Sequence, residues 1–230
     1  LELAGGHVDL WLLTHPHWDH IDAFTQIISS PEGIQIDAVV YDFPPLDWLC
    51  AAEPNEVHVK SNTAFYQAIK KFPGLIIKPR DGMRLTAGDI SIDVLSDPSD
   101  YQTVDYYKYI NNLSVVYRLN FENEKSAIFL GDLGPHASTK LMEKHGLALK
   151  SDIVQMSHHG FHGAFHGNHT VMRDLYRLIA PEFCLWPTPE WLWTNQNGQG
   201  PYTTPETRAW MDELNVKANL VTFAGDAVLK

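Results

Sequence analysis

The sequence predicts an α/β fold in which layered sheets are flanked by helices, and three observations lead to this prediction. Short apolar runs alternate with segments of helical periodicity. Between residues 75 and 130 the pattern is mostly β, with turn residues between the runs. Several apolar runs end directly in His-rich or Gly-Asp turns, where functional side chains are expected. Because no stretch rich in Pro, Gly or Ser marks a boundary, residues 1–230 are expected to form one domain.

Each expected element has its own local pattern. The strands are short apolar runs bounded by turn residues, expected at residues 8–14, 36–41, 75–78, 83–85, 90–95, 113–121, 126–130, 152–157, 183–186, 218–223 and 227–229. Helices are expected at residues 21–29, 62–72, 136–145, 169–179 and 205–214. The first has an apolar side and ends at Pro31-Glu32-Gly33, and the second ends at Pro73-Gly74. The polar turn at residues 122–125 predicts a hairpin. Residues 44–59 and 96–112 are expected to be irregular.

The acidic balance of the chain limits its partners. The formal net charge is −11 and the isoelectric point is near 5.4. No extended nucleic-acid surface is therefore expected, although a local site for an anionic small molecule or a nucleotide-like substrate is compatible with this charge. No apolar run reaches the roughly 18 residues that span a bilayer, and no signal-peptide pattern is present. A cytoplasmic location is favoured, and an extracellular one is the alternative if an N-terminal segment has been removed.

Histidines gather in two places along the chain. Three of the twelve fall at His15, His17 and His20, with Asp19 among them. In an extended stretch His15 and His17 point to the same side, so they are able to chelate one ion together. Asp19 and His20 come where the chain turns into a helix and are expected to face a second ion. Because imidazole and carboxylate are ligands of Zn²⁺, the spacing predicts two zinc ions, with manganese and iron as alternatives.

Two later turns are expected to complete the site. Gly131-Asp132 ends an apolar strand, and Asp132 is the candidate bridge between the two ions. Ser157-His158-His159-Gly160 ends another buried strand. One histidine of that pair is expected to ligate, and the other to orient substrate or donate a proton. The predicted metal ligands are His15, His17, Asp19, His20, Asp132, His158 and His159, and the predicted catalytic residues are Asp19 and His159.

Other conspicuous side chains are expected to have lesser roles. His58 falls in a segment expected to be irregular and is not expected to ligate. A substrate-facing loop is expected to carry His162, His166 and His169. The aromatic residues of a Pro- and Gly-rich stretch are expected to be core or scaffold, with the lining of a pocket as the alternative. They are Trp186, Trp191, Trp193 and Tyr202.

These motifs, taken in order, resemble the metallo-β-lactamase superfamily. Within it, they look most similar to the branch typified by the C-terminal domain of ComEC-type DNA-uptake proteins, and phosphorylcholine esterases are a looser comparison. The matching segments are THPHWDH at residues 14–20, NNLSVV at 111–116, FLGD at 129–132, SHHG at 157–160, Thr204-Pro205 and residues 220–229. The resemblance runs from about residue 10 to the C-terminus and implies an αββα sandwich.

The chain departs from this family in two places. Family members begin with extra strands carrying Asp-x-Gly, and only about seven residues precede the first expected strand here. The resemblance therefore implies either that the chain is a fragment or that its fold lacks the first N-terminal strands. Many relatives also carry a third histidine for the first ion in the segment matching 111–116, which has none here. The resemblance implies that Asn112 or a later histidine replaces it, or that this ion is held more weakly.

The chemistry that follows is hydrolysis by a metal-bound hydroxide, because a divalent ion lowers the pKa of bound water from about 15.7 toward about 7. Two such ions outweigh the charges of Asp19 and Asp132, which favours an anionic substrate, a phosphodiester or phosphomonoester. A lactone, lactam or thioester is the alternative substrate. Alternative roles are an iron protein of redox or sulfur chemistry, a non-catalytic metal- or ligand-binding module with a degenerate site, and an accessory domain of a longer membrane or cell-wall protein.

Overall fold

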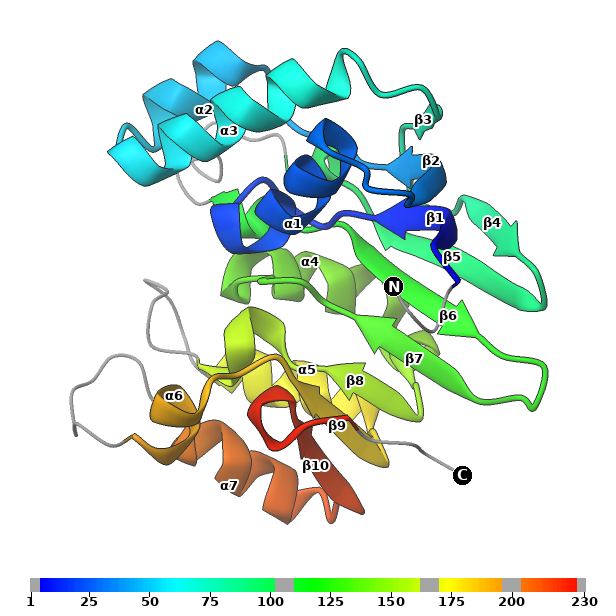
Figure 1. The fold of residues 1–230 in the computed structure, drawn as a ribbon. Coiled ribbons are helices and arrows are strands. Elements are labelled where there is room, and N and C mark those ends of the chain that lie inside the picture. The colour runs from blue at the N-terminus through cyan, green and yellow to red at the C-terminus, as the bar shows by residue number, and fades with distance from the viewer. Residues whose placement is uncertain (1–4, 102–109, 162–169, 196–203, 227–230) are drawn as a thin grey trace.

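The N-terminal apolar runs form a small parallel sheet (Figure 1). The computed structural model describes residues 5–101, 110–161, 170–195 and 204–226. Its first strands are β1 (His7–Leu12), β2 (Gln35–Val40) and β3 (Leu75–Ile77), in that order, with Leu10 opposite Ala38 in the register of the first pair. Parallel strands require crossover connections, which here are helical. These helices are α1 (Trp18–Ser29), α2 (Leu46–Ala52) and α3 (Glu56–Ile69).

The rest of the chain forms a seven-stranded sheet of mixed direction. Its strands are β4 (Arg84–Ala87), β5 (Ile90–Ser96), β6 (Val116–Asn120), β7 (Ser126–Phe129), β8 (Ile153–Gln155), β9 (Phe183–Trp186) and β10 (Ala218–Val221). The order β10-β9-β8-β7-β6-β5-β4 is antiparallel from β4 to β7 and parallel from β7 to β10. The helices in the parallel half are α4 (Pro135–His145), α5 (Thr170–Ile179), α6 (Glu190–Thr194) and α7 (Pro205–Glu213). Short 3₁₀ segments are η1 (Pro98–Tyr101), η2 (Ile110–Leu113), η3 (Gly146–Leu149), η4 (Ser157–Gly160) and η5 (Thr222–Ala224).

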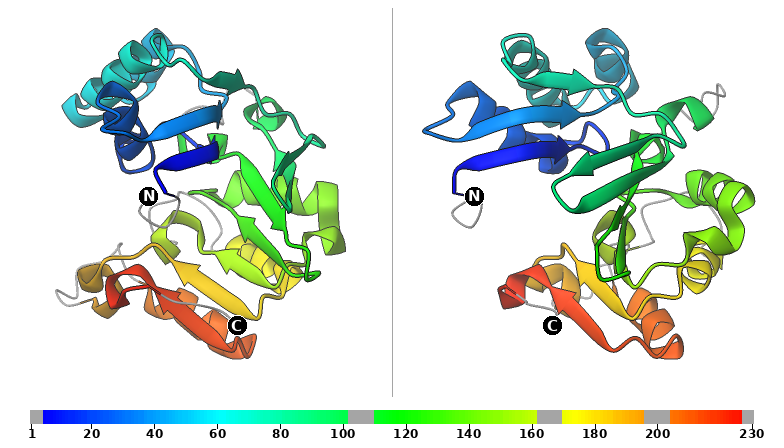
Figure 2. Two further views of the ribbon diagram at one scale, coloured as in Figure 1. Left: turned by 45° about the vertical axis from the view of Figure 1, so that its right-hand side comes forward. Right: turned by 90° about the vertical axis from the view of Figure 1, so that its right-hand side faces the viewer.

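Three buried hydrophobic clusters pack the layers against one another. One, with Phe24 and Phe65, packs α1 and α3 against the small sheet. A second, with Val40 and Tyr117, lies between the two sheets. The third packs α4, α5 and α7 on the outer face of the large sheet, and Figure 2 shows α4 and α5 (green and yellow) on the far side of that sheet from β1 and β2. The layers are therefore helix, sheet, sheet and helix, and the predicted αββα sandwich is confirmed.

Some predicted boundaries are wrong. Residues 44–59 are not irregular, because α2 and the first turn of α3 lie there. The Asn55 side chain accepts a hydrogen bond from the His58 amide at 3.0 Å, an N-cap that the sequence analysis overlooked. The strand expected at 113–121 starts only at Val116, after η2, and the one expected at 152–157 ends at Gln155, before η4. Residues 227–229 lie outside the described residues.

The structure also describes the two cysteines and the length of the helices. Cys50 is half-buried and Cys184 is buried, and both are free thiols, so they form no disulfide with each other. Among the described residues, no helix combines the length and apolarity needed to span a bilayer.

Tyr117 joins the two sheets and provides a first test of the architecture. Its hydroxyl donates to the Leu13 carbonyl at 2.9 Å, and both residues are almost fully buried. Tyr117→Phe should lower the free energy of unfolding by about 1–3 kcal/mol, because a buried carbonyl loses its donor. Urea denaturation measures this loss. Tyr41→Phe is the control, since the Tyr41 hydroxyl makes no hydrogen bond to a described residue. Equal losses in both variants would contradict the prediction.

Candidate metal centre

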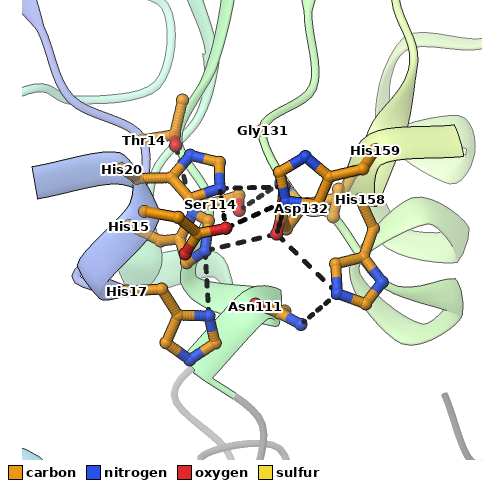
Figure 3. Close-up of polar contacts among 12 residues, drawn as sticks. Thr14, His15, His17, His20, Asn111, Ser114, Gly131, Asp132, His158 and His159 are labelled. Atoms are coloured by element: carbon orange, nitrogen blue, oxygen red, sulfur yellow. Dashed lines mark hydrogen bonds and ion pairs between the residues drawn. The ribbon is translucent and has the colours of Figure 1, made fainter. Parts of the chain in front are cut away.

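The first histidine motif follows the C-terminal end of β1 and leads into α1 (Figure 3). Its backbone is anchored, since the Val115 amide donates to the Thr14 carbonyl at 3.0 Å. Nε2 of the fully buried His15 lies 3.2 Å from Nδ1 of His17. Nδ1 of His15 lies 3.1 Å from the Thr14 hydroxyl. The two rings therefore present one nitrogen each to a common point, as the alternation of side chains in an extended segment predicts.

The second half of the motif occupies the first turn of α1. The His17 carbonyl accepts hydrogen bonds from the amides of His20 and Ile21, at 3.0 and 3.1 Å, so the helix begins within the motif. Nε2 of His20 lies 3.7 Å from Oδ2 of Asp19 and 3.2 Å from Oδ1 of Asp132. An acidic side chain in a first helical turn is also favoured by the helix dipole.

The carboxylate of Asp132 lies at the middle of the cluster, in the turn after β7. Gly131 has φ +57°, and a Cβ there would come within 2.8 Å of Thr14 Cβ and 2.9 Å of Ser114 Oγ. Only glycine allows this close approach. The Asp132 amide in turn donates to Ser114 Oγ at 3.1 Å. Oδ2 of Asp132 lies near three Nε2 atoms, at 3.7 Å for His15, 3.6 Å for His159 and 3.8 Å for His158.

The turn after β8 has a strained backbone. His158 and His159 have φ of 48° and 57°, and Gly160 has φ +84°. Non-glycine residues rarely adopt such values, and those that do cluster at functional sites. Nδ1 of His159 donates to the Pro187 carbonyl at 2.8 Å, so Nε2 faces the cluster, 3.0 Å from Oδ2 of Asp19. Figure 3 shows both imidazoles directed into the cluster from the side opposite the first motif.

The structure brings all seven predicted ligands together and sorts most of them into two groups that share Asp132. One group is His15, His17 and Asp132, and the other is Asp19, His20, Asp132 and His159. Within each group the candidate ligand atoms lie within 4.8 Å of one another. His158 lies beside Asp132 but outside both groups. The spacing of the first motif predicts this division, and the binding of cations by it stays a prediction.

The residues present fit divalent cations. In a neutral His159 ring the single N–H is on Nδ1, where it donates to the Pro187 carbonyl. Nε2 then turns its lone pair toward the Asp19 carboxylate, and this arrangement is repulsive unless positive charge lies between the two groups. Nε2 of His20 and Oδ1 of Asp132 are both buried, and neither makes a hydrogen bond of acceptable geometry to any residue that the structure describes. Imidazole and carboxylate together are the donor set of zinc, and manganese and iron accept the same ligands.

The charge balance of the cluster also favours a cation. Burial, together with the neighbouring His20, holds the pKa of His15 well below its ordinary value. Burial would raise the pKa of Asp132, but the charges of His15 and His20 hold that pKa well below its usual range. Burial would lower the pKa of His159, but the hydrogen bond with Asp19 and the charge of Asp132 raise it to about 9. The carboxylates are therefore ionised at neutral pH and attract positive charge.

The sequence analysis did not place Glu53 or His58 beside the cluster. Glu53 and His58 lie next to His17, and these three side chains form a further group with a suitable ligand spacing, whereas His58 was expected to lie apart. No local pattern signals Glu53, because its position depends on how α2 packs. The resemblance implied Asn112, but the Asn112 side chain accepts from the Ala137 amide at 3.4 Å.

The neighbouring residue Asn111 is the one that reaches the cluster. Its Nδ2 lies 3.5 Å from Nε2 of His158. The short η2 segment decides which of the two asparagines faces the site, and the sequence pattern does not distinguish them. His162, His166 and His169 lie outside the described residues.

The aromatic residues of the Pro- and Gly-rich stretch mostly serve as scaffold. Trp186 is fully buried in the main core, and Trp193 packs against it with ring centroids 5.0 Å apart. This agrees with the expected core role for both. Trp191 is more than half exposed on α6, and Tyr202 falls outside the described residues.

Comparison with known proteins supports the fold. No family model and no curated protein matches the chain. The structure of CmlA, a diiron β-hydroxylase from Streptomyces venezuelae, is similar over 94% of this chain and 43% of that chain, with a TM-score of 0.52 and 14% identity. A CmlA mutant matches over the same shares, with a TM-score of 0.50 and 15% identity. The metallo-β-lactamase fold protein YhfI from Bacillus subtilis covers 93% of this chain and 74% of its own, with a TM-score of 0.47 and 12% identity.

These likenesses bear on the architecture alone. The chain spans less than half the length of the CmlA chains it matches. The metallo-β-lactamase-like αββα fold expected from the motifs is confirmed by the layers and by the likeness to the two CmlA structures. The finer resemblance to the ComEC-type branch stays a prediction.

Proposed function

We propose that this chain, as one domain, is a metal-dependent hydrolase that binds two divalent cations and cleaves a phosphodiester or phosphomonoester. The observation that carries the proposal is the division of the cluster into two ligand groups that share the buried Asp132. Phosphoryl transfer is the chemistry for which paired cations about 3.5–4 Å apart are widely used in proteins. The resemblance to the ComEC-type branch favours the same substrate class.

The ligands are assigned from the geometry. His15, His17 and Asp132 hold one cation, and Asp19, His20, Asp132 and His159 hold the other. Divalent cations so held supply Lewis acidity, lower the pKa of a water molecule and stabilise charge on phosphate oxygens.

The chain's own residues orient the reactants. His158 lies outside both ligand groups yet close to Asp132, so we assign it to hydrogen bonding with substrate. Asn111 approaches the same nitrogen of His158, Nε2, at 3.5 Å. His159 is assigned as a ligand fixed by the Pro187 carbonyl. Oδ2 of Asp19 lies 3.0 Å from Nε2 of His159, so both side chains face the place assigned to the second cation. The His158 amide donates to the Gly131 carbonyl at 3.1 Å, which joins the two later turns, and the Val115 amide anchors the first motif at Thr14. These groups are therefore held in place before substrate binds.

The substrate is proposed to be an anionic small molecule or a nucleotide-like ester. Two divalent cations carry more positive charge than Asp19 and Asp132 neutralise, so the site attracts anions although the whole chain is acidic. Zinc is the proposed metal. Because one protein of the same fold is described as a diiron β-hydroxylase, iron and manganese must be measured beside it.

The proposal predicts that Asp19→Ala loses both metal and activity. Wild-type protein purified without chelator should contain about two cations per chain by elemental analysis and should hydrolyse bis-p-nitrophenyl phosphate. Asp19→Ala should retain about one cation and lose at least about 100-fold in rate, since even outer partners of metal ligands contribute 10–100-fold. Asp174→Ala, which removes an exposed carboxylate from α5, should match the wild type.

Two results would contradict the proposal. One is a wild type that binds no cation under these conditions. The other is a wild type that binds two cations but cleaves neither phosphodiesters nor phosphomonoesters, which would leave the centre as a metal-binding module.

A further inference from the structure

A carboxylate stands behind the first ligand group. Glu53 is the C-cap residue of α2, and its Oε2 lies 3.1 Å from Nε2 of His17. The same oxygen contacts Nδ1 of His58, in the first turn of α3. All three side chains are largely buried, with exposed fractions of 13% for His17, 22% for Glu53 and 18% for His58. The contact is therefore partly shielded from water, where an ion pair is stronger than at the surface.

The two nitrogens of His17 have different partners. Nδ1 faces Nε2 of His15 at 3.2 Å, on the side of the candidate cation, and Nε2 faces Glu53. A neutral imidazole carries one proton, and a carboxylate only accepts. The proton must therefore sit on Nε2, and the lone pair on Nδ1 points at the first ligand group. Carboxylates that fix the tautomer of a metal-binding histidine in this way strengthen metal binding.

His58 contacts the same carboxylate oxygen from a different helix. The His58 backbone is fixed twice, because its amide donates to the Asn55 side chain at 3.0 Å and its carbonyl accepts from the Asn62 side chain at 3.0 Å. The imidazole then contacts Glu53 from α3 while His17 contacts it from the start of α1. The carboxylate is thus held by residues from two other helices, and its position does not depend on α2 alone.

We propose that Glu53, steadied by His58, is a positioning residue that directs Nδ1 of His17 toward the first cation. This inference rests on the proposed function. The first ligand group offers three side chains where the second offers four, so the first cation depends more on how well each ligand is oriented. The Glu53 pair supplies that orientation in a chain whose 111–116 segment has no histidine.

The test is a Co²⁺ titration of wild type, Glu53→Ala and Glu53→Gln, followed by absorption and by bound-metal analysis. Glu53→Ala should bind two Co²⁺ ions with one of them weakened by about 10–100-fold and its absorption spectrum changed. Glu53→Gln should lie between, because its amide oxygen still accepts from His17. Glu56→Ala, which removes an exposed carboxylate from the same region, is the control. Circular dichroism of the metal-free proteins checks that all variants are folded.

The same Glu53→Ala substitution, made in the Asp19→Ala variant, identifies which cation is affected. In Asp19→Ala, only the first group retains all its ligands, so adding Glu53→Ala should weaken the one remaining Co²⁺ ion by the same factor. A wild type that binds no Co²⁺ overturns the proposed function and this inference with it. If Glu53→Ala binds two Co²⁺ ions with unchanged affinity and an unchanged spectrum, this inference is overturned and the proposed function is not. Three ions in wild type and two unchanged ions in Glu53→Ala overturn it as well, because Glu53 would then be a direct ligand of a further cation.

Discussion

Asp132→Asn is expected to abolish the binding of both cations and, with it, the hydrolysis of phosphate esters. The carboxylate belongs to both ligand groups, so its loss removes a ligand from each. Asparagine preserves the volume of the side chain but lacks the negative charge that balances the surrounding histidines and cations. A loss of at least about 100-fold in affinity for each cation is expected, because removal of a mere outer partner costs 10–100-fold.

Isothermal titration with Zn²⁺ and elemental analysis measure this effect. The matched control is Asp97→Asn, which removes an equally buried carboxylate whose partners are the amides of Asp81 and Ser99. That variant should keep two cations. If Asp132→Asn still bound two cations at wild-type affinity, the shared position of Asp132 would be wrong, and the two ligand groups would have to be separate sites.

The centre could be predicted where local geometry decides it. Side-chain alternation places His15 beside His17, and the start of a helix carries Asp19 and His20 to another point. Asp132 and the His158-His159 pair follow neighbouring parallel strands, β7 and β8, so their turns meet at one edge of the sheet. The arrangement of the first motif is a short-range consequence of pattern. Asp132 and the His158-His159 pair were found because each follows the end of an apolar run, whereas the pairing of β7 with β8 was not predicted.

What the sequence analysis missed depends on packing between distant segments. Glu53 lies 36 positions after His17 and reaches it only because α2 ends beside the first motif. The helix itself was overlooked because residues 44–59 were expected to be irregular, although proline is well tolerated at the start of a helix. The choice of Asn111 over Asn112 depends on the single turn of η2. Such contacts are not visible in the hydrophobic periodicity of the sequence.

Gly160→Ala is expected to destabilise the fold and disable the second ligand group together. Gly160 has φ +84°, where a residue with a Cβ costs about 1–2 kcal/mol. A Cβ there would also lie 2.1 Å from Cζ3 of Trp186. That ring is fully buried, and its Nε1 donates to Asn219 at 2.8 Å, so it has little room to move. Overpacking of a core typically costs about 1–3 kcal/mol more, so the free energy of unfolding should fall by about 2–5 kcal/mol in total.

The matched control is Gly33→Ala, because Gly33 has the same φ of +84° and no atom within 4 Å of its Cβ position. It should lose only the backbone contribution, about 1–2 kcal/mol. Urea denaturation of metal-free protein gives both values, and zinc titration should show a weakened second cation in Gly160→Ala alone, because His159 precedes the displaced residue. Equal losses of stability in the two variants would mean that Trp186 yields to the new methyl group. The strained His158-His159 turn would then be held by its hydrogen bonds to Pro187 and Thr188 rather than by the packing of Gly160 on Trp186.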